Sequence, residues 1–426
     1  MRTLPWRDDP WEMVAALRRL APPADEVRRA VAAIVADVRA RGDEAVREHT
    51  RRLDGVDLPA DYRLPPAAAG RCLAGLDPAV REALALAVAN VRAYHERERP
   101  RGWRATLAQG QVVGQEVVPV AVAGLYVPGG LADYPSSVVM TAVPAQVAGV
   151  GRLVVCSPPR PDGGVAPGVA AACALLGVDD VYPVGGAQAV AAMALGTATV
   201  PRCDVIVGPG NAYVTEAKRQ LAGEVGIDGL AGPSEVVVVC DESGEPEWLA
   251  ADLLAQAEHG AGAVACLVDV GGTRLAAVSA AVGRLAAELG LDSGAVVGTA
   301  CPDAAAALAF VNAFAPEHLE LHCRDAAALV PAVRNAGAVF VGPYAATAFA
   351  DYAAGSNHVL PTGGAARFSQ GLSVDAFCKR VAVVELDAAA AAALAPAVTA
   401  LAGEEGLRAH ARSAALRATP RGEGGR

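Results

Sequence analysis

The sequence predicts an α/β protein built on two Rossmann-like parallel sheets. Short runs rich in valine and isoleucine recur beyond residue 120, and Ala-rich segments of helical length separate them. Near-continuous apolar strands are typical of parallel sheets that helices cover on both faces. A chain of 426 residues is long enough for two groups of such strands, so we expect two sheets rather than one.

The first hundred residues are predicted to be mainly helical. From Pro22 to Gly55 apolar residues recur at three- and four-residue spacing, with an interruption at Gly42-Asp43. A second helix is expected to begin at Asp77-Pro78, an N-cap followed by a proline in the first turn, and to run to about Glu98.

The expected strands follow in order along the chain. They are LVVCSP (153–158), DVIVGPG (204–210), EVVVVCD (235–241), AVACLVD (263–269) and RVAVVELD (380–387). The uncharged run 181–201 contains prolines and glycines, so it predicts a strand, a glycine turn and a helix rather than a membrane span. After the last strand we expect an Ala-rich helix, a short amphipathic helix ending near Thr419, and a frayed tail, RGEGGR.

The composition is that of an ordinary globular protein. Apolar residues make up 53% of the chain, charged residues 19%, and the formal net charge is -10. Binding to nucleic acid or to an anionic membrane needs clustered positive charge, so neither partner is expected. The nine cysteines contain no Cys-x-x-Cys pair, and the N-terminus has no apolar signal segment. We therefore expect a reducing, cytoplasmic compartment.

Three glycine-rich segments follow apolar strands, where a parallel sheet presents its ligand crevice. They are GLYVPGG (124–130), VGGAQA (184–189) and GPGNAYV (208–214). None has the Gly-x-Gly-x-x-Gly spacing of a dinucleotide fingerprint. Spacing alone leaves two interpretations open, loops that bind an anion or small ligand and ordinary strand-to-helix turns.

Polar side chains suited to metal binding or proton transfer gather in three places. In DLLAQAEHG (252–260), Gln256 and His259 are three apart on an expected helix, hence about 5–6 Å apart on one face, with Asp252 one turn earlier. This is half of a metal site or an ordinary helix surface.

The second place, APEHLEL (315–321), holds Glu317 and His318, the two residue types most used as general bases. Its alternative is a solvated turn at the end of a strand. The third, DYAAGSNHVLPTGG (351–364), is an expected loop in which Asp351 and His358 are candidate ligands.

Taken together, these segments resemble the histidinol dehydrogenase family. The matching segments occur in the family's order: GLYVPGG, YPSS (134–137), VGGAQA, GPGNAYVTEAKRQ (208–220), AGPSE (231–235), QAEHG (256–260), APEHLE (315–320), GSNHVLPT (355–362) and EGLRAH (405–410). The resemblance implies two incomplete versions of the nucleotide-binding fold. It also implies a homodimer that oxidises L-histidinol through L-histidinaldehyde to L-histidine, the last steps of histidine biosynthesis, with two NAD and one Zn²⁺ per subunit.

The resemblance assigns roles residue by residue. The metal ligands would be Gln256, His259, Asp351 and His410, a set without thiolate. His318 would accept the hydroxyl proton and Glu317 would activate water. These four ligands and His318 would also contact substrate, together with Ser234, His358 and Glu405, whereas Tyr126, Gln188 and Asn211 would contact NAD.

The expected domains are an N-terminal arm (1–20), a first Rossmann-like domain (21–120 with 236–378), a second (121–235) and a C-terminal extension (379–426). In the family that extension crosses to the partner, so Glu405 and His410 would complete the neighbour's site. His322, Cys323 and Cys378 match no role and are expected to be packing or surface residues.

Three other function classes remain to be compared with a dehydrogenase. In a zinc hydrolase, Glu317 would activate metal-bound water, and formation of NADH from histidinol separates the two. In a non-catalytic binder the Glu-His pair would be dispensable. A cysteine-nucleophile aldehyde dehydrogenase is disfavoured because no cysteine lies in a motif that resembles that family's active loop.

Overall fold

The computed structural model describes residues 1–18, 25–129, 133–260 and 262–418. The chain forms two units. The first comprises Met1–Glu98 and Val120–Phe377, and the second comprises Arg99–Pro119 and the chain from Cys378 onward. The predicted tail RGEGGR lies outside the described residues.

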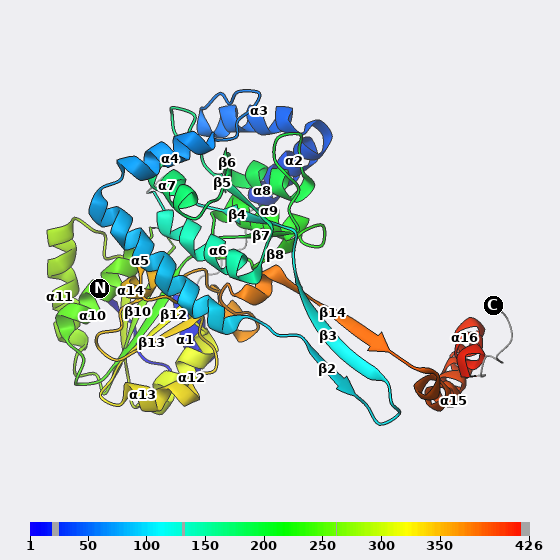
Figure 1. The fold of residues 1–426 in the computed structure, drawn as a ribbon. Helices are drawn as coiled ribbons and strands as arrows, with labels where there is room; N and C mark the ends of the chain where they lie inside the picture. Colours follow the sequence, from blue (N-terminus) through cyan, green and yellow to red (C-terminus); the bar gives the residue numbers. More distant parts are fainter. Residues whose placement is uncertain (19–24, 130–132, 261, 419–426) are drawn as a thin grey trace. The chain divides into compact units, whose positions relative to one another are not determined.

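The first unit contains a five-stranded parallel sheet in the order β6-β5-β4-β7-β8 (Figure 1). The strand order reverses between β4 and β7, as in one half of a Rossmann fold. The strands are β4 (Val122–Tyr126), β5 (Arg152–Ser157), β6 (Asp180–Pro183), β7 (Val205–Val207) and β8 (Gly226–Ile227), and the helices that connect them are α6 (Pro135–Ala148), α7 (Pro167–Leu175), α8 (Gly186–Leu195) and α9 (Ala212–Leu221).

The N-terminal helices pack around this five-stranded sheet. They are α2 (Asp25–Arg41), α3 (Asp43–Asp54), α4 (Pro66–Gly75) and α5 (Pro78–His95), followed by a 3-10 turn, η1 (Glu96–Glu98). The predicted break at Gly42 is confirmed, since α2 ends before it with φ +55 at the glycine. The predicted start of α5 is also confirmed, because the Asp77 side chain accepts a hydrogen bond from the Ala79 amide.

The apolar side chains of α2 and α3 join the core of the five-stranded sheet. Val31 and Ile34 of α2 belong to the same cluster as Ile206 of β7. The structure therefore does not support the placing of these two helices in the first predicted domain. The other domain boundaries stay predictions.

A second parallel sheet has six strands in the order β1-β11-β10-β9-β12-β13. The order reverses between β9 and β12, so this sheet repeats the half-Rossmann arrangement with β1 added at one edge. The strands are β1 (Arg2–Thr3), β9 (Glu235–Cys240), β10 (Val264–Val270), β11 (Val296–Cys301), β12 (His318–His322) and β13 (Ala338–Val341). The prediction of two Rossmann-like parallel sheets is confirmed.

Helices cover both faces of the six-stranded sheet. Helices α1 (Pro10–Leu17) and α12 (Ala304–Phe314) cover one face, and α10 (Pro246–Ala257) and α11 (Leu275–Leu289) cover the other. Val237 in β9 belongs to the first layer and its neighbour Val238 to the second, which explains the uninterrupted valine run. The remaining short helices are α13 (Ala326–Leu329), α14 (Thr347–Tyr352), η2 (Val330–Ala332), η3 (Ala365–Arg367) and η4 (Val374–Phe377).

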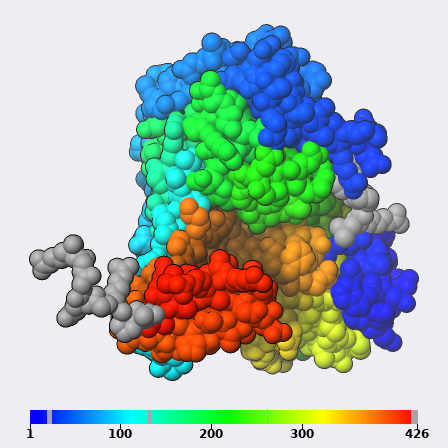
Figure 2. Space-filling view, turned by 90° about the vertical axis from the view of Figure 1, so that its right-hand side faces the viewer, coloured from blue at the N-terminus to red at the C-terminus, as the bar shows by residue number. Residues whose placement is uncertain are grey.

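The second unit is an antiparallel sheet in the order β14-β3-β2 with two helices. Its elements are β2 (Trp103–Thr106), β3 (Val112–Pro119), β14 (Cys378–Glu385), α15 (Ala388–Glu404) and α16 (Arg408–Ala418). Figure 2 shows α15 and α16, in orange-red and red, packed side by side. The predicted last strand and the two helices after it are confirmed, and the structure adds the antiparallel pairing of that strand, β14, with β3. Among the described residues, no helix is long and apolar enough to cross a membrane.

A buried ion pair joins the segment after α1 to the start of β9. The Arg18 guanidinium donates to both carboxylate oxygens of Glu235, at 2.7 and 2.6 Å, and lies 3.9 Å from the centre of the Phe314 ring. Both charged side chains are almost fully buried. Burial raises the pKa of Glu235 to about 7, while Arg18 acts in the opposite direction.

Replacing Arg18 by methionine is expected to destabilise the protein in a pH-dependent way. Glu235 would lose the Arg18 cation, and its pKa in the folded state would rise further above the unfolded value of 4.5. Between those two values the folded state holds a proton that the unfolded state lacks, so the free energy of unfolding falls as pH rises. Denaturant titration should show a loss of about 3–5 kcal/mol near pH 8 and a smaller loss near pH 5.5.

The exposed pair Arg39–Glu224 supplies the control. Arg39→Met should cost less than about 1 kcal/mol at both pH values, because solvent screens a surface pair. An equally small effect of Arg18→Met would show that the buried pair does not stabilise the fold.

Candidate active site

The candidate site begins at the amino ends of β9 and β12, the two strands between which the order of the six-stranded sheet reverses. Parallel pairing sets His318 opposite Val236, which brings Glu317 beside Ser234 and Glu235. The chain turns from α12 into β12 at Ala315, whose φ of +51 makes it the one non-glycine residue with positive φ among those described.

Glu317 is a buried carboxylate held by one of its oxygens. Its Oε2 accepts hydrogen bonds from the Ser234 hydroxyl at 2.6 Å and the Glu235 amide at 3.0 Å. Burial raises its pKa to about 7 against these two hydrogen bonds. Because both described donors use Oε2, Oε1 is the oxygen able to face a water molecule.

His318 is a buried imidazole without a hydrogen-bond partner on either nitrogen among the described residues. Its Nδ1 lies 3.8 Å from Glu317 Oε2, and its ring centre lies 6.0 Å from that of Phe340. Burial lowers its pKa, which favours the neutral ring that can accept a proton. The alternative of a solvated turn at the end of a strand is wrong, since both side chains are buried and lie at the beginning of β12.

Gln256 and His259 lie at the carboxyl end of α10. The helix ends at Ala257, so Gln256 is in its last turn and His259 is in the turn that follows, one residue beyond the helical C-cap. The expected shared helix therefore stops short of His259. His259 Nδ1 lies 3.0 Å from the Ala255 carbonyl, which fixes the proton on Nδ1 and leaves the lone pair of Nε2 free.

Asp351 and His358 come from α14 and the loop after it. Asp351 lies in α14, and burial raises its pKa while His318 and His259 lower it. His358 Nδ1 lies 3.0 Å from the Asp351 carbonyl, and Nε2 lies 3.5 Å from the Ser137 hydroxyl at the start of α6. Burial lowers the pKa of His358 to about 4. The predicted loop is confirmed beyond Tyr352.

The structure brings most of the predicted residues of the first unit together. The charges of His259 and Asp351 act on both Glu317 and His318. The assembled group is Ser234, Gln256, His259, Glu317, His318, Asp351 and His358. Glu405 and His410 belong to the second unit, where Glu405 caps α15, His410 lies in α16, and both are exposed.

The residues expected to contact NAD lie at the carboxyl edge of the five-stranded sheet. Tyr126 ends β4 and accepts a hydrogen bond from the Gly186 amide at 3.0 Å. Gln188 lies in the first turn of α8, and Asn211 caps α9 by accepting from the Tyr213 and Val214 amides. Tyr126 and Gln188 are almost fully buried.

The third glycine-rich segment needs its first glycine. Gly208 has φ +113, and a Cβ there would lie 2.1 Å from the Tyr126 carbonyl oxygen. Only glycine permits this approach of two strand ends. The predicted position of the glycine-rich segments after β4, β6 and β7 is confirmed within the described residues.

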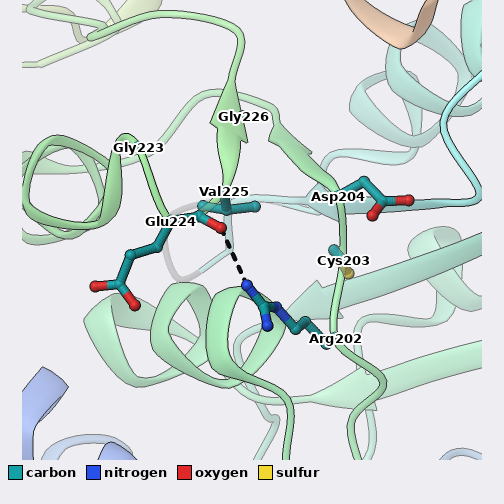
Figure 3. A pocket seen from close by; sticks show the side chains of 7 residues that line it. All are labelled: Arg202, Cys203, Asp204, Gly223, Glu224, Val225 and Gly226. Atoms are coloured by element: carbon teal, nitrogen blue, oxygen red, sulfur yellow. Dashed lines mark hydrogen bonds between the residues drawn. The ribbon is translucent and has the colours of Figure 1, made fainter. Parts of the chain in front are cut away.

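A surface pocket on the five-stranded sheet lies at the opposite, amino edge (Figure 3). Its lining residues are Arg202, Cys203, Asp204, Gly223, Glu224, Val225 and Gly226. Arg202 donates to the Glu224 carbonyl, and Asp204 accepts from the Ala121 and Val122 amides, so these groups close the sheet edge. Parallel sheets of this kind bind ligands at the carboxyl edge, and none of the predicted residues lines this pocket.

Glu320 is a buried polar residue that no sequence motif singled out. Asp252, Glu320 and His322 present nitrogen and oxygen atoms within 4.8 Å of one another, close to α10 and β12. His322 is only 2% exposed, so of the two expectations, a packing residue or a surface residue, the structure favours the first. A sequence signal for this cluster does exist. Polar and apolar residues alternate strictly in HLELH (318–322), which sets His318, Glu320 and His322 on one face of the strand.

The cysteines do not supply a nucleophile to this site. Cys323, which directly follows β12, lies buried, and burial raises the pKa of its thiol to about 12. A buried thiol of this kind is inert rather than reactive.

Comparison with known proteins identifies the family. The family model described as histidinol dehydrogenase matches residues 17–418. The chain is 48% identical to the histidinol dehydrogenase of Pseudomonas aeruginosa over 404 residues, covering 92% of this chain and 91% of the relative. It is 45% identical to that of Geobacillus kaustophilus over 413 residues, 95% of this chain and 97% of the relative.

The similarity extends to the three-dimensional structure. The crystal structure of histidinol dehydrogenase from Elizabethkingia anophelis matches with a TM-score of 0.92 and 32% identity, covering 98% of each chain. A family match over nearly the whole sequence, close relatives and a matching fold agree with the convergence of the motif residues. This chain belongs to the histidinol dehydrogenase family.

Proposed function

We propose that the chain catalyses the zinc-dependent, four-electron oxidation of L-histidinol to L-histidine through L-histidinaldehyde, with two NAD used in turn. Family membership makes it an oxidoreductase of histidine biosynthesis. The observation that carries the finer proposal is the buried Glu317–His318 pair, which lies beside Gln256, His259 and Asp351.

The side chains present fit a zinc ion. His259 offers a free Nε2, and burial raises the pKa of the Asp351 carboxylate, so a cation beside it would stabilise its charged form. The Ser234 hydroxyl lies 2.6 Å from Glu317 Oε2 and 3.3 Å from Gln256 Oε1, and Gln256 Nε2 has no hydrogen-bond partner among the described residues. The hydroxyl has one proton, which goes to the nearer Glu317 oxygen, so Gln256 Oε1 keeps lone pairs that a cation can use. Two imidazoles, a carboxylate and an amide oxygen form a nitrogen and oxygen set that suits Zn²⁺.

The fourth ligand, His410, would come from the C-terminal segment of a second copy, together with the substrate-binding Glu405. Ser234 and His358 would contact substrate from this chain. Bound zinc would hold the imidazole and amine nitrogens of histidinol and orient its carbinol carbon. We propose one zinc per subunit, a homodimer with exchanged C-terminal segments, and a cytoplasmic enzyme.

His318 would serve as the base in the first oxidation. Burial lowers its pKa, which favours the neutral ring, and neither nitrogen has a hydrogen-bond partner among the described residues, so one of them can receive the proton of the substrate hydroxyl. Bound NAD accepts the hydride that leaves the same carbon. Tyr126, Gln188 and Asn211 are the proposed NAD contacts.

Glu317 would serve as the base in the second oxidation. Its raised pKa makes it a stronger base than an ordinary carboxylate, and its Oε1 is open toward a water molecule. Removal of a proton from that water lets its oxygen attack the aldehyde carbon. The hydrated aldehyde then loses a second hydride and gives the carboxylate.

The overall reaction is tested by its stoichiometry and metal dependence. We expect two NADH per histidinol, measured by absorbance, and loss of activity after removal of zinc with a chelator. Added zinc should restore the activity, which controls for damage by the chelator. Formation of one NADH, or full activity in the metal-free protein, would contradict the proposal.

Glu317→Gln is expected to separate the two half-reactions. The amide cannot take a proton from water, so oxidation of L-histidinaldehyde should slow by about 10²- to 10⁴-fold, whereas oxidation of histidinol should slow much less. Stopped-flow measurement of each half-reaction checks this. Equal losses in both would remove the assignment of Glu317 as the water-activating base.

His318→Asn is expected to slow the proton-transfer-limited steps by about 10²- to 10⁴-fold, because asparagine cannot accept the hydroxyl proton. Single-turnover rates with histidinol measure this effect. His49→Asn, which alters another buried histidine in the same unit, is the matched control and should retain the wild-type rate. Comparable rates in the two variants would exclude His318 as the base.

A further inference from the structure

We propose that Glu320 is a positioning residue that fixes α10 and α14 at the separation at which Gln256, His259 and Asp351 can share one ion. Asp252, His322 and Thr347 are its partners in this role. The inference rests on the metal ligands proposed above, and it assigns a task to four polar residues that the proposed reaction does not use.

Glu320 caps the helix that carries Asp351. The residue before α14 is Ala346, which has no side chain able to cap it. Glu320, which lies in the strand β12, caps the helix instead. Its Oε1 accepts hydrogen bonds from the Thr347 amide and the Thr347 hydroxyl, each at 2.7 Å. Asp351 lies one helical turn beyond Thr347, so this contact sets its place relative to His318.

The other oxygen of Glu320 is tied toward α10. Its Oε2 lies 3.2 Å from His322 Nε2, and that nitrogen lies 3.6 Å from Asp252 Oδ2. Asp252 also hydrogen-bonds Glu320, and its pKa is raised to about 7 by burial and by the Glu320 charge. Asp252 lies on α10 one turn before Gln256. One carboxylate therefore connects β12, α10 and α14.

The burial of this cluster gives the connection its strength. Glu320 is fully buried and His322 nearly so. A buried carboxylate without partners is costly, so any movement of α10 or α14 away from Glu320 is opposed by the loss of charge-assisted hydrogen bonds. The apolar alternate residues Leu319 and Leu321 hold β12 in the core on its other face.

An alternative role for Asp252, Glu320 and His322 is to bind a second cation. Their contacts favour hydrogen bonds among the three side chains over cation binding. Glu320 Oε1 already accepts two hydrogen bonds, and Oε2 accepts from His322 Nε2. His322 Nδ1 has no hydrogen-bond partner among the described residues, so a proton on Nδ1 would be a buried donor without an acceptor. A proton on Nε2 instead has the Glu320 oxygen as its acceptor. A zinc ligand must offer a lone pair at the coordinating nitrogen, which this arrangement does not supply.

Zinc affinity, measured on the full-length protein by competition with a chelator, tests the proposal. Glu320→Gln should weaken zinc binding by about 10- to 100-fold, as expected when a group that orients metal ligands is lost. Thr347→Val should weaken binding in the same direction, and Thr347→Ser should restore it because the hydroxyl is kept. This second pair keeps the test decisive should Glu320→Gln fail to fold.

Asp269→Asn is the matched control. Asp269 is a fully buried carboxylate on the same sheet that accepts from the Arg274 and Leu275 amides at the start of α11, a helix that carries none of the proposed ligands. Denaturant titration should show that this variant loses stability, whereas its zinc affinity should equal that of the wild type.

Wild-type affinity in Glu320→Gln, or an equal loss of affinity in Asp269→Asn, would overturn the proposal. Two zinc ions per wild-type chain and one in His322→Asn would also overturn it, in favour of a second cation site. Asp351→Ala separates the two levels of inference. If Asp351→Ala abolishes zinc binding and Glu320→Gln leaves it unchanged, only the positioning role fails, whereas wild-type affinity in Asp351→Ala overturns the proposed ligand set and this role with it.

Discussion

The parallel pairing of β9 with β12 is the constraint on which the site depends. Their register sets His318 opposite Val236, so Glu317 accepts hydrogen bonds from the Ser234 hydroxyl and the Glu235 amide at the amino ends of the two strands. A one-residue shift would turn every side chain of β12 to the other face. It would place the two leucines in the polar layer and His318, Glu320 and His322 in the apolar core.

The two sheets present opposite edges to their functional residues. The five-stranded sheet places Tyr126, Gln188 and Asn211 after its strands, at the carboxyl edge expected of a nucleotide-binding fold. The six-stranded sheet places Glu317 directly before β12 and His318 at the first position of that strand, at the amino edge of the sheet. Burial at this second edge has opposite effects on acids and bases, raising the pKa of Glu317 and lowering that of His318. Both side chains thereby become capable proton acceptors near neutral pH.

The sequence allowed the fold to be predicted where local patterns were unambiguous. Valine runs buried on both faces, capped helix starts and glycine turns located most strands and helices of both sheets. The sequence did not predict that the Glu-His pair lies at the amino edge of the six-stranded sheet. The segment before the pair, α12, is so apolar that its sequence does not distinguish a helix from a buried strand. The ligand set came from motif resemblance, since residues more than a hundred positions apart carry no local signal of contact. Glu320 lies in none of the positions to which the motifs assign a role, and the alternating pattern around it is the only local signal of its polar face.

The Arg18–Glu235 pair gives the amino-terminal segment a part in the catalytic architecture. Glu235 is the first residue of β9, and its backbone amide is one of the two donors that hold Glu317. The segment Met1–Arg18, which adds the edge strand β1 and the helix α1, therefore anchors the same strand that orients Glu317, the carboxylate proposed to activate water. Shortened versions of the protein that begin after Arg18 would retain every proposed ligand and base. They would nevertheless leave the buried Glu235 carboxylate, next to the proposed site, without its Arg18 partner.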